Sequence, residues 1–209
     1  MPATDDPSPA PPARKAGWWS DLSAIAVAVV VVFSARHSLA DHYHVPTGSM
    51  IPSVEIGDRV WVSKAAYSLR IPFTPFGLRT GTPHHGDVVV LRSPDDGVTL
   101  LKRVAAVPGD TVSVRRGRLE LNGSPVLVTA DGDALRETLG AATHPIRLDA
   151  GGGPSYGPIV VPSGKYLVLG DNRGNSRDGR MFGLVSEDAL MGRVGGTYLR
   201  GGRLHFERF

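Results

Sequence analysis

One serine and one lysine in this chain stand in surroundings that favour nucleophilic catalysis. Ser49 ends the turn-like sequence Pro-Thr-Gly-Ser, and Lys102 lies within the apolar run of residues 98–107. A serine hydroxyl is a poor nucleophile until a neighbouring base takes its proton. No convincing Ser-His-Asp set accompanies Ser49, so Lys102 is the natural candidate for that base. The pair predicts a serine hydrolase that uses a Ser-Lys dyad.

Each member of this pair needs a particular environment. Gly48 lets the backbone turn tightly, which can expose Ser49 and aim its N–H at a reacting carbonyl, with the Thr47 hydroxyl as a further donor. Strand alternation places Lys102 on an apolar face and Arg103 on the opposite face, where it can reach water. Burial lowers the pKa of a lysine because desolvation penalises the charged form, so a buried amine can act as a base. Taken alone, the same residues also fit an ordinary turn and a strand lysine that snorkels or pairs with a carboxylate.

A polar, glycine-rich segment at residues 170–183 follows the apolar stretch 166–169. Polar loops that follow a core strand are common places for a functional site. If the end of the segment is extended, Ser176, Asp178 and Arg180 share one face, which predicts an Asp178–Arg180 ion pair with a serine beside it. The competing interpretation is a solvated turn. The glycine spacing matches neither nucleotide-binding fingerprint.

Composition limits the other functions open to the chain. The 209 residues include 26 Gly and 17 Pro, no Cys, and a net charge of +3. So small a net charge gives no argument for a nucleic-acid partner, and we expect none. The lack of cysteine removes disulfides, thiol catalysis and thiolate metal sites. The histidines are scattered and form no helical metal-binding pair, so we expect no metal and no cofactor.

The first 40 residues divide into a tail and an apolar segment. Residues 1–17 contain five prolines and almost nothing apolar, so we expect them to be disordered. An uncharged apolar run covers residues 22–35, and its flanks extend it to the 23 residues of 17–39. About 20 residues are needed to cross the hydrocarbon core of a bilayer. We predict a single transmembrane anchor at residues 18–40.

The residues around this anchor predict its orientation in the cell membrane. Arg14 and Lys15 precede it, which favours a cytoplasmic N-terminus and an extracytoplasmic domain at residues 41–209. An alternative is a cleaved signal peptide, because Ser38-Leu39-Ala40 is a small-x-small sequence. A mature protein that starts at Asp41 would have lost the anchor.

From residue 41 onward the hydrophobic pattern has the period of two that is typical of strands. Strands are predicted at residues 58–64, 86–92, 98–107, 111–115, 118–122, 165–170 and 193–200. Hairpin turns are predicted at Arg115-Arg116-Gly117 and Asn122-Gly123. Residues 129–158 are glycine-rich and irregular, with a short helix near residues 134–139, and we interpret them as a variable insert. The fold class is mostly β, with an antiparallel body that follows one N-terminal helix.

Four segments, residues 43–64, 86–91, 102–110 and 170–185, resemble the motif boxes of type I signal peptidases in content and order. The likeness is to the short, single-anchor bacterial form and extends over most of the chain after residue 20, weakly over the insert. It implies a mostly antiparallel β body that rests on the membrane. It also implies a serine endopeptidase that removes signal peptides from exported preproteins after small-x-small sites.

The resemblance gives roles to the residues that match the family's catalytic positions. Ser49 would be the nucleophile and Lys102 the general base. Thr47 stands where the family often has a serine, and its hydroxyl would complete the oxyanion hole. Ser176 would hydrogen-bond the Lys102 amine and orient it.

The last box carries both a match and several departures. Asp178 and Arg180 match a supporting ion pair. Gly174 and Gly179 stand where the family commonly has an acid and a serine, and Phe182 stands for a frequent Trp. The positions that match the substrate pocket are Tyr43, Val45, Met50, Val54, Val90, Leu100 and Leu101.

The resemblance also implies partners. The substrate would lie extended and add to strand edges. The expected partners are signal peptides of preproteins, the lipid bilayer and a nearby secretion translocon, without metal or nucleotide. Because Ala40 precedes Ser49 by only nine residues, self-cleavage after Ala40 is a further hypothesis.

Two other functions compete with this interpretation. A self-cleaving repressor-type Ser-Lys protease should carry a DNA-binding helical domain, and residues 1–40 offer a tail and an apolar segment instead. A catalytically inactive, membrane-anchored β scaffold would not need both Ser49 and Lys102.

Overall fold

The computed structural model of the protein describes residues 21–29, 40–70, 77–132 and 134–209. Residues 21–29 are helical. Across these described ranges, no helix combines the length and the apolar character needed to cross a membrane. The predicted tail at residues 1–17 and most of the predicted anchor at residues 18–40 lie outside the described residues.

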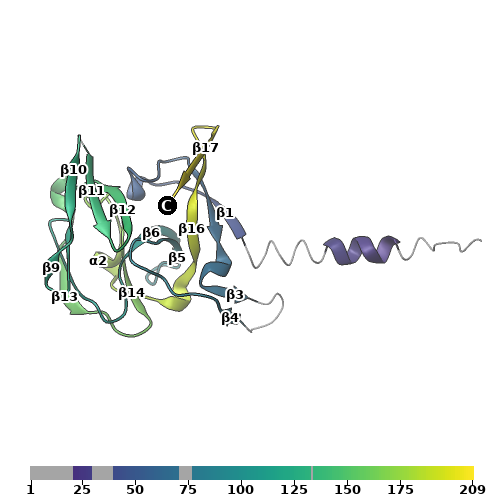
Figure 1. Cartoon of the computed structure of the whole chain (residues 1–209), viewed down its shortest axis with the longest axis horizontal. Coiled ribbons are helices and arrows are strands. Elements are labelled where there is room, and N and C mark those ends of the chain that lie inside the picture. The colour runs from purple at the N-terminus through teal and green to yellow at the C-terminus, as the bar shows by residue number, and fades with distance from the viewer. Residues whose placement is uncertain (1–20, 30–39, 71–76, 133) are drawn as a thin grey trace, which may run out of the picture.

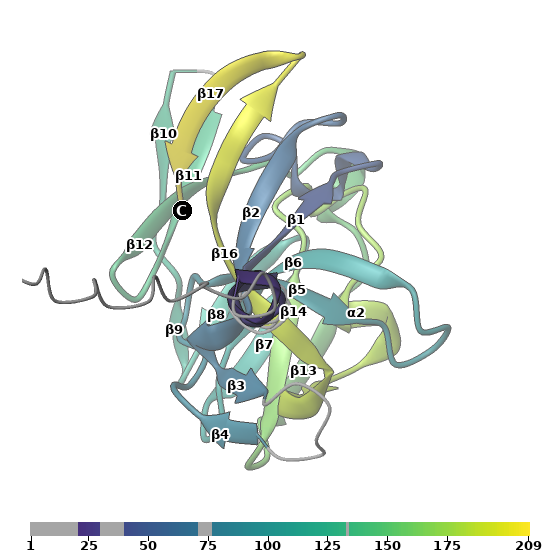
Figure 2. The same ribbon diagram turned by 90° about the vertical axis from the view of Figure 1, so that its right-hand side faces the viewer.

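The largest sheet has eight antiparallel strands and fills one half of the body in Figure 1. Its order is β1-β2-β16-β5-β6-β14-β15, and β17 pairs with β16. The strands are β1 (Ala40–His44), β2 (Arg59–Ser63), β5 (Val88–Arg92), β6 (Thr99–Ala106), β14 (Lys165–Leu169), β15 (Val185–Ser186), β16 (Leu190–Arg200) and β17 (Arg203–Arg208). Figure 2 shows the β16–β17 hairpin reaching beyond the other strands of this sheet.

Three smaller sheets and several short helical turns complete the body. One sheet has the order β13-β7-β8-β9, the second has the order β10-β11-β12, and β3 pairs with β4. Their bounds are β3 (Ser68–Arg70), β4 (Gly77–Arg79), β7 (Thr111–Arg115), β8 (Arg118–Leu121), β9 (Ser124–Pro125), β10 (Val128–Asp131), β11 (Ala134–Leu139), β12 (Ala142–Ile146) and β13 (Tyr156–Val160). The helical turns are η1 (Gly48–Met50), η2 (Lys64–Ala66), η3 (Ala150–Gly152), η4 (Glu187–Ala189) and α2 (Gly179–Phe182).

The mostly β, antiparallel fold class is confirmed for the described residues. All the predicted strands are present, as β2, β5, β6, β7, β8, β14 and β16. The two predicted hairpin turns are present as well. Arg116 and Gly117 have φ of 51° and 74°, and Asn122 and Gly123 have φ of 53° and 78°. Two successive positive φ values match the twist of a tight antiparallel hairpin.

The irregular conformation and the short helix predicted within residues 129–158 are wrong. Most of this stretch forms the β10–β12 sheet, and the predicted helix at residues 134–139 is strand β11. Along β11, Glu137 and Leu139 are buried whereas Arg136 is exposed, which is the period of two expected of a half-buried strand. Tertiary burial of one face therefore overrides the helix propensity of the Ala, Leu, Arg and Glu residues in this segment.

Strand β6 connects the separate parts of the hydrophobic core. Leu101 packs against the cluster under β2 and β5, and Val104 belongs to the cluster that includes Tyr166 and Leu190. Ala105 belongs to the third cluster, which lies against β7 and β8. Because β6 contacts all three clusters, its backbone is fixed along its length, and so is the position from which Lys102 projects.

Candidate active site

The turn that carries Ser49 is the single 3₁₀ turn η1. Thr47 precedes it in an extended conformation, and the N–H of Ile51 closes it by donating to the Gly48 carbonyl at 3.2 Å. Met50 is fully buried and anchors the turn in the core. A Cβ on Gly48 would lie 2.9 Å from Ile51 Cδ1, so glycine leaves room for the Ile51 side chain against the turn. Ser49 is left half-buried, beside a cavity.

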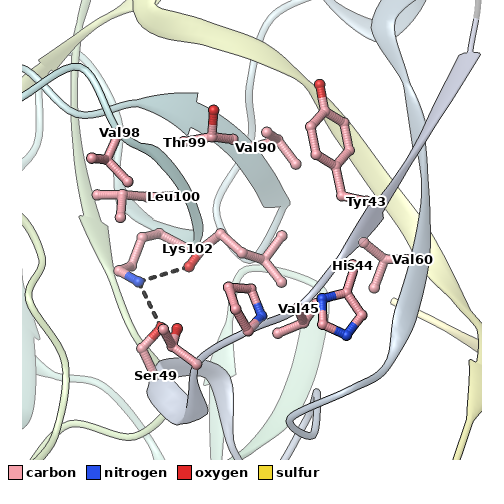
Figure 3. Close-up of a pocket in the computed structure, with 13 residues that line it drawn as sticks. Tyr43, His44, Val45, Ser49, Val60, Val90, Val98, Thr99, Leu100 and Lys102 are labelled. Atoms are coloured by element: carbon pink, nitrogen blue, oxygen red, sulfur yellow. Dashed lines mark hydrogen bonds between the residues drawn. The ribbon is translucent and has the colours of Figure 1, made fainter.

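Lys102 reaches Ser49 from β6, as Figure 3 shows. Its Nζ donates a hydrogen bond to Ser49 Oγ at 2.7 Å and another to the Leu101 carbonyl at 2.8 Å. The side chain is only 2 % exposed. Burial lowers the pKa of the Lys102 amine to about 8, although the carboxylates of Asp178 and Asp171 act in the opposite direction. The predicted placement of Lys102 in apolar surroundings is confirmed.

A cavity of about 140 Å³ opens beside the pair. In Figure 3, Ser49 and Lys102 lie at one end of it and Tyr43 lies at the other. The lining is largely apolar and consists of Tyr43, His44, Val45, Pro46, Thr47, Ser49, Val60, Val90, Val98, Thr99, Leu100, Leu101 and Lys102. Thr47 therefore lies at the cavity with Ser49, as predicted.

The residues predicted for the substrate pocket fall into two groups in the structure. Tyr43, Val45, Val90, Leu100 and Leu101 line the cavity. Met50 and Val54 do not, because both are completely buried in the core cluster behind it.

Leu100 and Leu101 point to opposite faces of β6, yet both line the cavity, because the cavity lies at a strand edge. Strand β14 pairs with β6 from Arg103 to Ala106, whereas β5 pairs with it from Thr99 onward. Among the described residues, positions 99–102 are therefore paired on the β5 side alone.

The predicted Asp178–Arg180 ion pair is present and buried. Arg180 Nε donates to Asp178 Oδ1 at 2.8 Å, and Arg180 Nη2 donates to Asp178 Oδ2 at the same distance. The Gly170 N–H also donates to Asp178 Oδ2, at 3.0 Å. The extended conformation ends at Asp178, which is the N-cap of α2, so Arg180 lies in a helical turn and not in an extended segment. The pair ties the end of the polar segment to its beginning.

The surroundings predicted for Arg103 are wrong. Its side chain is 3 % exposed and does not reach water. Nε and Nη2 bind the two carboxylate oxygens of Asp171 at 2.9 and 2.7 Å, and Nη1 donates to the Gly86 carbonyl at 2.8 Å. Burial opposes ionisation of Asp171, but Arg103 outweighs it and holds the pKa of that carboxyl below its usual value. Strand alternation correctly places Arg103 on the face of β6 opposite Lys102. That face does not meet water, because the segment that begins at residue 170 covers it.

Asn172 holds the Ser49 turn in place, a contact that the sequence did not predict. Its N–H donates to the Ser49 carbonyl at 3.1 Å, and its side-chain amide donates to the Gly48 carbonyl at 3.1 Å. The acceptors are backbone atoms of residues far away in the sequence. The only sequence signal was the position of Asn172 in a dense polar segment.

Comparison with known proteins places this site in a family. The family model described as "Signal peptidase, peptidase S26" matches residues 18–199. The chain belongs to this family. The family resemblance predicted from the motif boxes is therefore confirmed.

Individual signal peptidases are similar over most of the chain. Signal peptidase I of Pseudomonas fluorescens is 34 % identical over 188 residues, which cover 78 % of this chain and 66 % of that protein. The chain thus spans slightly less than two thirds of that relative. Signal peptidase IB of Staphylococcus aureus is 35 % identical over 183 residues, 83 % of this chain and 85 % of that protein. A crystal structure of a signal peptidase I from Enterococcus faecalis matches with 28 % identity and a TM-score of 0.37, covering 54 % of this chain and 96 % of that chain.

Two of the departures expected from the resemblance, Gly174 and Gly179, lie where this chain leaves little room for a side chain. A Cβ on Gly174 would lie 1.7 Å from the Asp149 carbonyl oxygen. A Cβ on Gly179 would lie 2.9 Å from the Val168 carbonyl oxygen. The backbone of a neighbouring segment therefore passes close to each of these glycines.

The hydrogen bond predicted between Ser176 and the Lys102 amine does not form in this structure. Ser176 Oγ is buried and has no hydrogen-bond partner within the described part of the chain. It packs against Gly170, where an added Cβ would lie 2.2 Å from Ser176 Oγ and 2.5 Å from the Ser49 carbonyl oxygen. Ser176 therefore lies beside the Ser49 turn, while the Leu101 carbonyl provides the second acceptor for Lys102.

Proposed function

We propose that the chain is a serine endopeptidase of the signal peptidase type, with Ser49 as nucleophile and Lys102 as general base. The observation that carries the proposal is the 2.7 Å contact between Lys102 Nζ and Ser49 Oγ, made by an amine that is almost fully buried. The family and the names of the relatives support this activity. The proposed substrates are the signal peptides of exported preproteins, cut after small-x-small sites.

The proposed reaction needs only proton transfers between these groups and the substrate. The neutral Lys102 amine takes the proton of Ser49 Oγ as that oxygen attacks the scissile carbonyl carbon. The Ser49 N–H and the Thr47 hydroxyl stabilise the oxyanion. The tetrahedral intermediate collapses, the C–N bond breaks, and protonated Lys102 gives its proton to the leaving amine. Lys102 then activates a water that hydrolyses the acyl-enzyme and regenerates Ser49.

The edge of β6 and the cavity together suit an extended substrate with apolar side chains. Positions 99–102 are paired with β5 alone among the described residues, so a peptide can add as a further strand. A cavity of about 140 Å³, shared by the catalytic pair and the apolar lining, can take side chains of such a peptide. Val90 and Leu101 provide apolar surface for these groups. These features support binding of an extended peptide at the proposed catalytic pair.

The proposed location is the cell membrane. A 23-residue segment at 17–39 supports a single anchor, with a cytoplasmic N-terminus and a catalytic domain on the outer side near the translocon. N-terminal sequencing of the mature protein tests this placement. An intact N-terminus agrees with an anchor, whereas a start at Asp41 would indicate removal of the segment and contradict it.

Cleavage of a preprotein tests the catalytic proposal directly. The full chain, in detergent, should cut a preprotein with an Ala-x-Ala site once, at a position that mass spectrometry can locate. Ser49→Ala should reduce the product to background, whereas the matched control Ser155→Ala, at an exposed serine, should leave the rate unchanged. Equal processing by Ser49→Ala and the unmodified chain would contradict the proposal and favour a scaffold.

The pH dependence of cleavage should report the Lys102 amine. With a pKa of about 8, lowered mainly by burial, roughly a tenth of the amine is neutral at pH 7 and roughly nine-tenths at pH 9. Because only the neutral amine accepts the Ser49 proton, kcat/KM should rise with pH through about 8 and then level off. Measurement of kcat/KM between pH 6 and pH 10 checks this. A flat profile between pH 7 and pH 9 would argue against Lys102 as the base.

A further inference from the structure

One face of the β10–β12 sheet is buried and carries two ionisable side chains. Glu137 of β11 and His144 of β12 are direct cross-strand partners, and their exposures are 0 % and 4 %. Leu139 and Ile146 are buried on the same face. Burying an ionisable group costs free energy unless partners compensate for the lost water. Glu137 and His144 therefore need polar partners, and those partners show which other part of the molecule this sheet contacts.

Glu137 binds Arg173, which belongs to the polar segment after β14. Arg173 Nη1 donates to Glu137 Oε1 at 2.9 Å, and Nη2 binds Glu137 Oε2. Arg173 also donates to the carbonyls of Gly117 at 2.6 Å and Gly170 at 3.1 Å. Burial opposes ionisation of Glu137, but the Arg173 guanidinium holds the pKa of the carboxyl below its usual value. Glu137 thus fixes a buried cation of the segment that borders the Ser49 turn.

His144 lies between two carboxylates. Its Nε2 is 3.4 Å from Glu137 Oε2 and 3.8 Å from Asp171 Oδ1. Neither ring nitrogen makes a hydrogen bond within the described residues. The carboxylate of Asp171 is paired with Arg103, as that of Glu137 is with Arg173. The imidazole therefore separates two buried ion pairs whose carboxylates would otherwise face each other.

Asp171 and Arg173 flank Asn172, the residue that holds the Ser49 turn. The Asn172 hydrogen bonds to the Gly48 and Ser49 carbonyls depend on the placement of this three-residue stretch. Just beyond β12, the Arg147 N–H donates to the Asp171 carbonyl at 2.9 Å, and the Arg173 N–H donates to the Arg147 carbonyl at 2.8 Å. Direct contacts therefore run from the β10–β12 sheet to the proposed nucleophile.

We propose that Glu137 and His144 are positioning residues for the active site, acting through Arg173 and Asp171 on Asn172 and thus on the Ser49 turn. The inference rests on the proposed peptidase function. It gives residues 129–158 a role in catalysis rather than that of a passive insert. Loss of either side chain should displace the Ser49 N–H and Oγ relative to Lys102, and small displacements of reacting groups cost large factors in rate.

Steady-state kinetics of full-chain variants on the same preprotein test the inference. Glu137→Gln and His144→Leu should each lower kcat about tenfold or more, because the reacting groups are misplaced. Their KM should stay within about twofold of the unmodified chain, because the cavity is built from other elements. His144→Leu leaves the Glu137–Arg173 pair in place and keeps the test open if Glu137→Gln does not fold.

Two control variants separate positioning from loss of stability. Leu139→Ala removes apolar packing from the same face and should lower the melting temperature while kcat stays close to that of the unmodified chain. Arg136→Gln breaks the exposed Arg136–Asp131 pair on the other face and should change neither quantity. Normal kcat in both Glu137→Gln and His144→Leu would overturn the inference, and so would a kcat loss in Leu139→Ala equal to theirs.

The Ser49→Ala variant distinguishes failure of the inference from failure of the proposed function. If the unmodified chain cleaves the preprotein, Ser49→Ala does not, and the Glu137 and His144 variants cleave normally, only the inference fails. If the unmodified chain and Ser49→Ala process the preprotein equally, the peptidase function fails and the inference fails with it.

Discussion

Replacement of Lys102 by methionine should abolish cleavage while leaving the protein folded. Methionine has a similar length and keeps the apolar contacts of the lysine stem, but it cannot take the Ser49 proton. Loss of the base in a serine hydrolase typically costs a factor of about 10³ or more in kcat. Assay of the variant on a preprotein measures the loss. Lys165→Met, at an exposed lysine of β14, is the matched control and should cleave normally.

The same substitution should raise stability at neutral pH. Burial lowers the pKa of Lys102 from 10.5 to about 8 in the folded state. At neutral pH, folding must therefore either bury the charged amine or remove its proton, and both cost free energy. That shift corresponds to about 3 kcal/mol of destabilisation at pH 7, which is relieved as pH rises from about 8 to 10.5. Lost hydrogen bonds to Ser49 and Leu101 offset part of the gain. Urea unfolding of the variant and the unmodified chain, at pH 7 and at pH 10.5, measures the change in the free energy of unfolding at each pH.

The informative quantity is the difference between the effect of Lys102→Met on stability at pH 7 and its effect at pH 10.5. The stabilising effect of Lys102→Met should be largest below pH 8 and should fall toward zero at about pH 10.5, where half of the unfolded lysine is also neutral. An effect that is independent of pH over this range would mean that the folded lysine keeps its ordinary pKa. In that case Lys102 would be cationic at neutral pH and unsuited to act as the base.

The contact between Ser49 and Lys102 was predictable because its signals are local. Ser49 lies in a short turn sequence, and the strand alternation that places Lys102 in apolar surroundings spans only a few residues. Most strands near the site follow from the same period of two. The order of the motif boxes predicted the family and, through it, the expected substrates. Asp178 and Arg180 meet because they are two positions apart at the start of a capped helical turn.

The rest of the site depends on contacts that no short pattern encodes. Arg103 faces away from Lys102, but whether that face meets water or Asp171 depends on a segment almost seventy residues away. Asn172 acts on backbone carbonyls, which every residue type provides, so its partners leave no mark in the sequence. Glu137 lies in a segment with helical propensity, but burial of one face of β11 overrides that propensity and brings Glu137 to Arg173.

Replacement of Arg103 by methionine should cause a large loss of stability. It leaves the Asp171 carboxylate buried without its cation, and breaking a buried ion pair in this way costs about 3–5 kcal/mol. The Gly86 carbonyl would also lose a donor. Chemical denaturation at pH 7 measures the change. Arg177→Met, which breaks the exposed pairs with Asp95 and Asp96, is the matched control and should change stability little.

The pH dependence of the Arg103→Met effect identifies its cause. In the unmodified protein the pKa of Asp171 is held below 3.8, so its contribution to stability is present above that value and is lost as pH falls through the folded pKa. In the variant, burial without Arg103 raises that pKa, and the carboxyl takes up a proton at a higher pH. The stability difference should therefore be greatest at neutral pH and shrink below about pH 4. A difference that stays constant down to about pH 3 would mean that lost packing, not the unpaired charge, destabilises the variant.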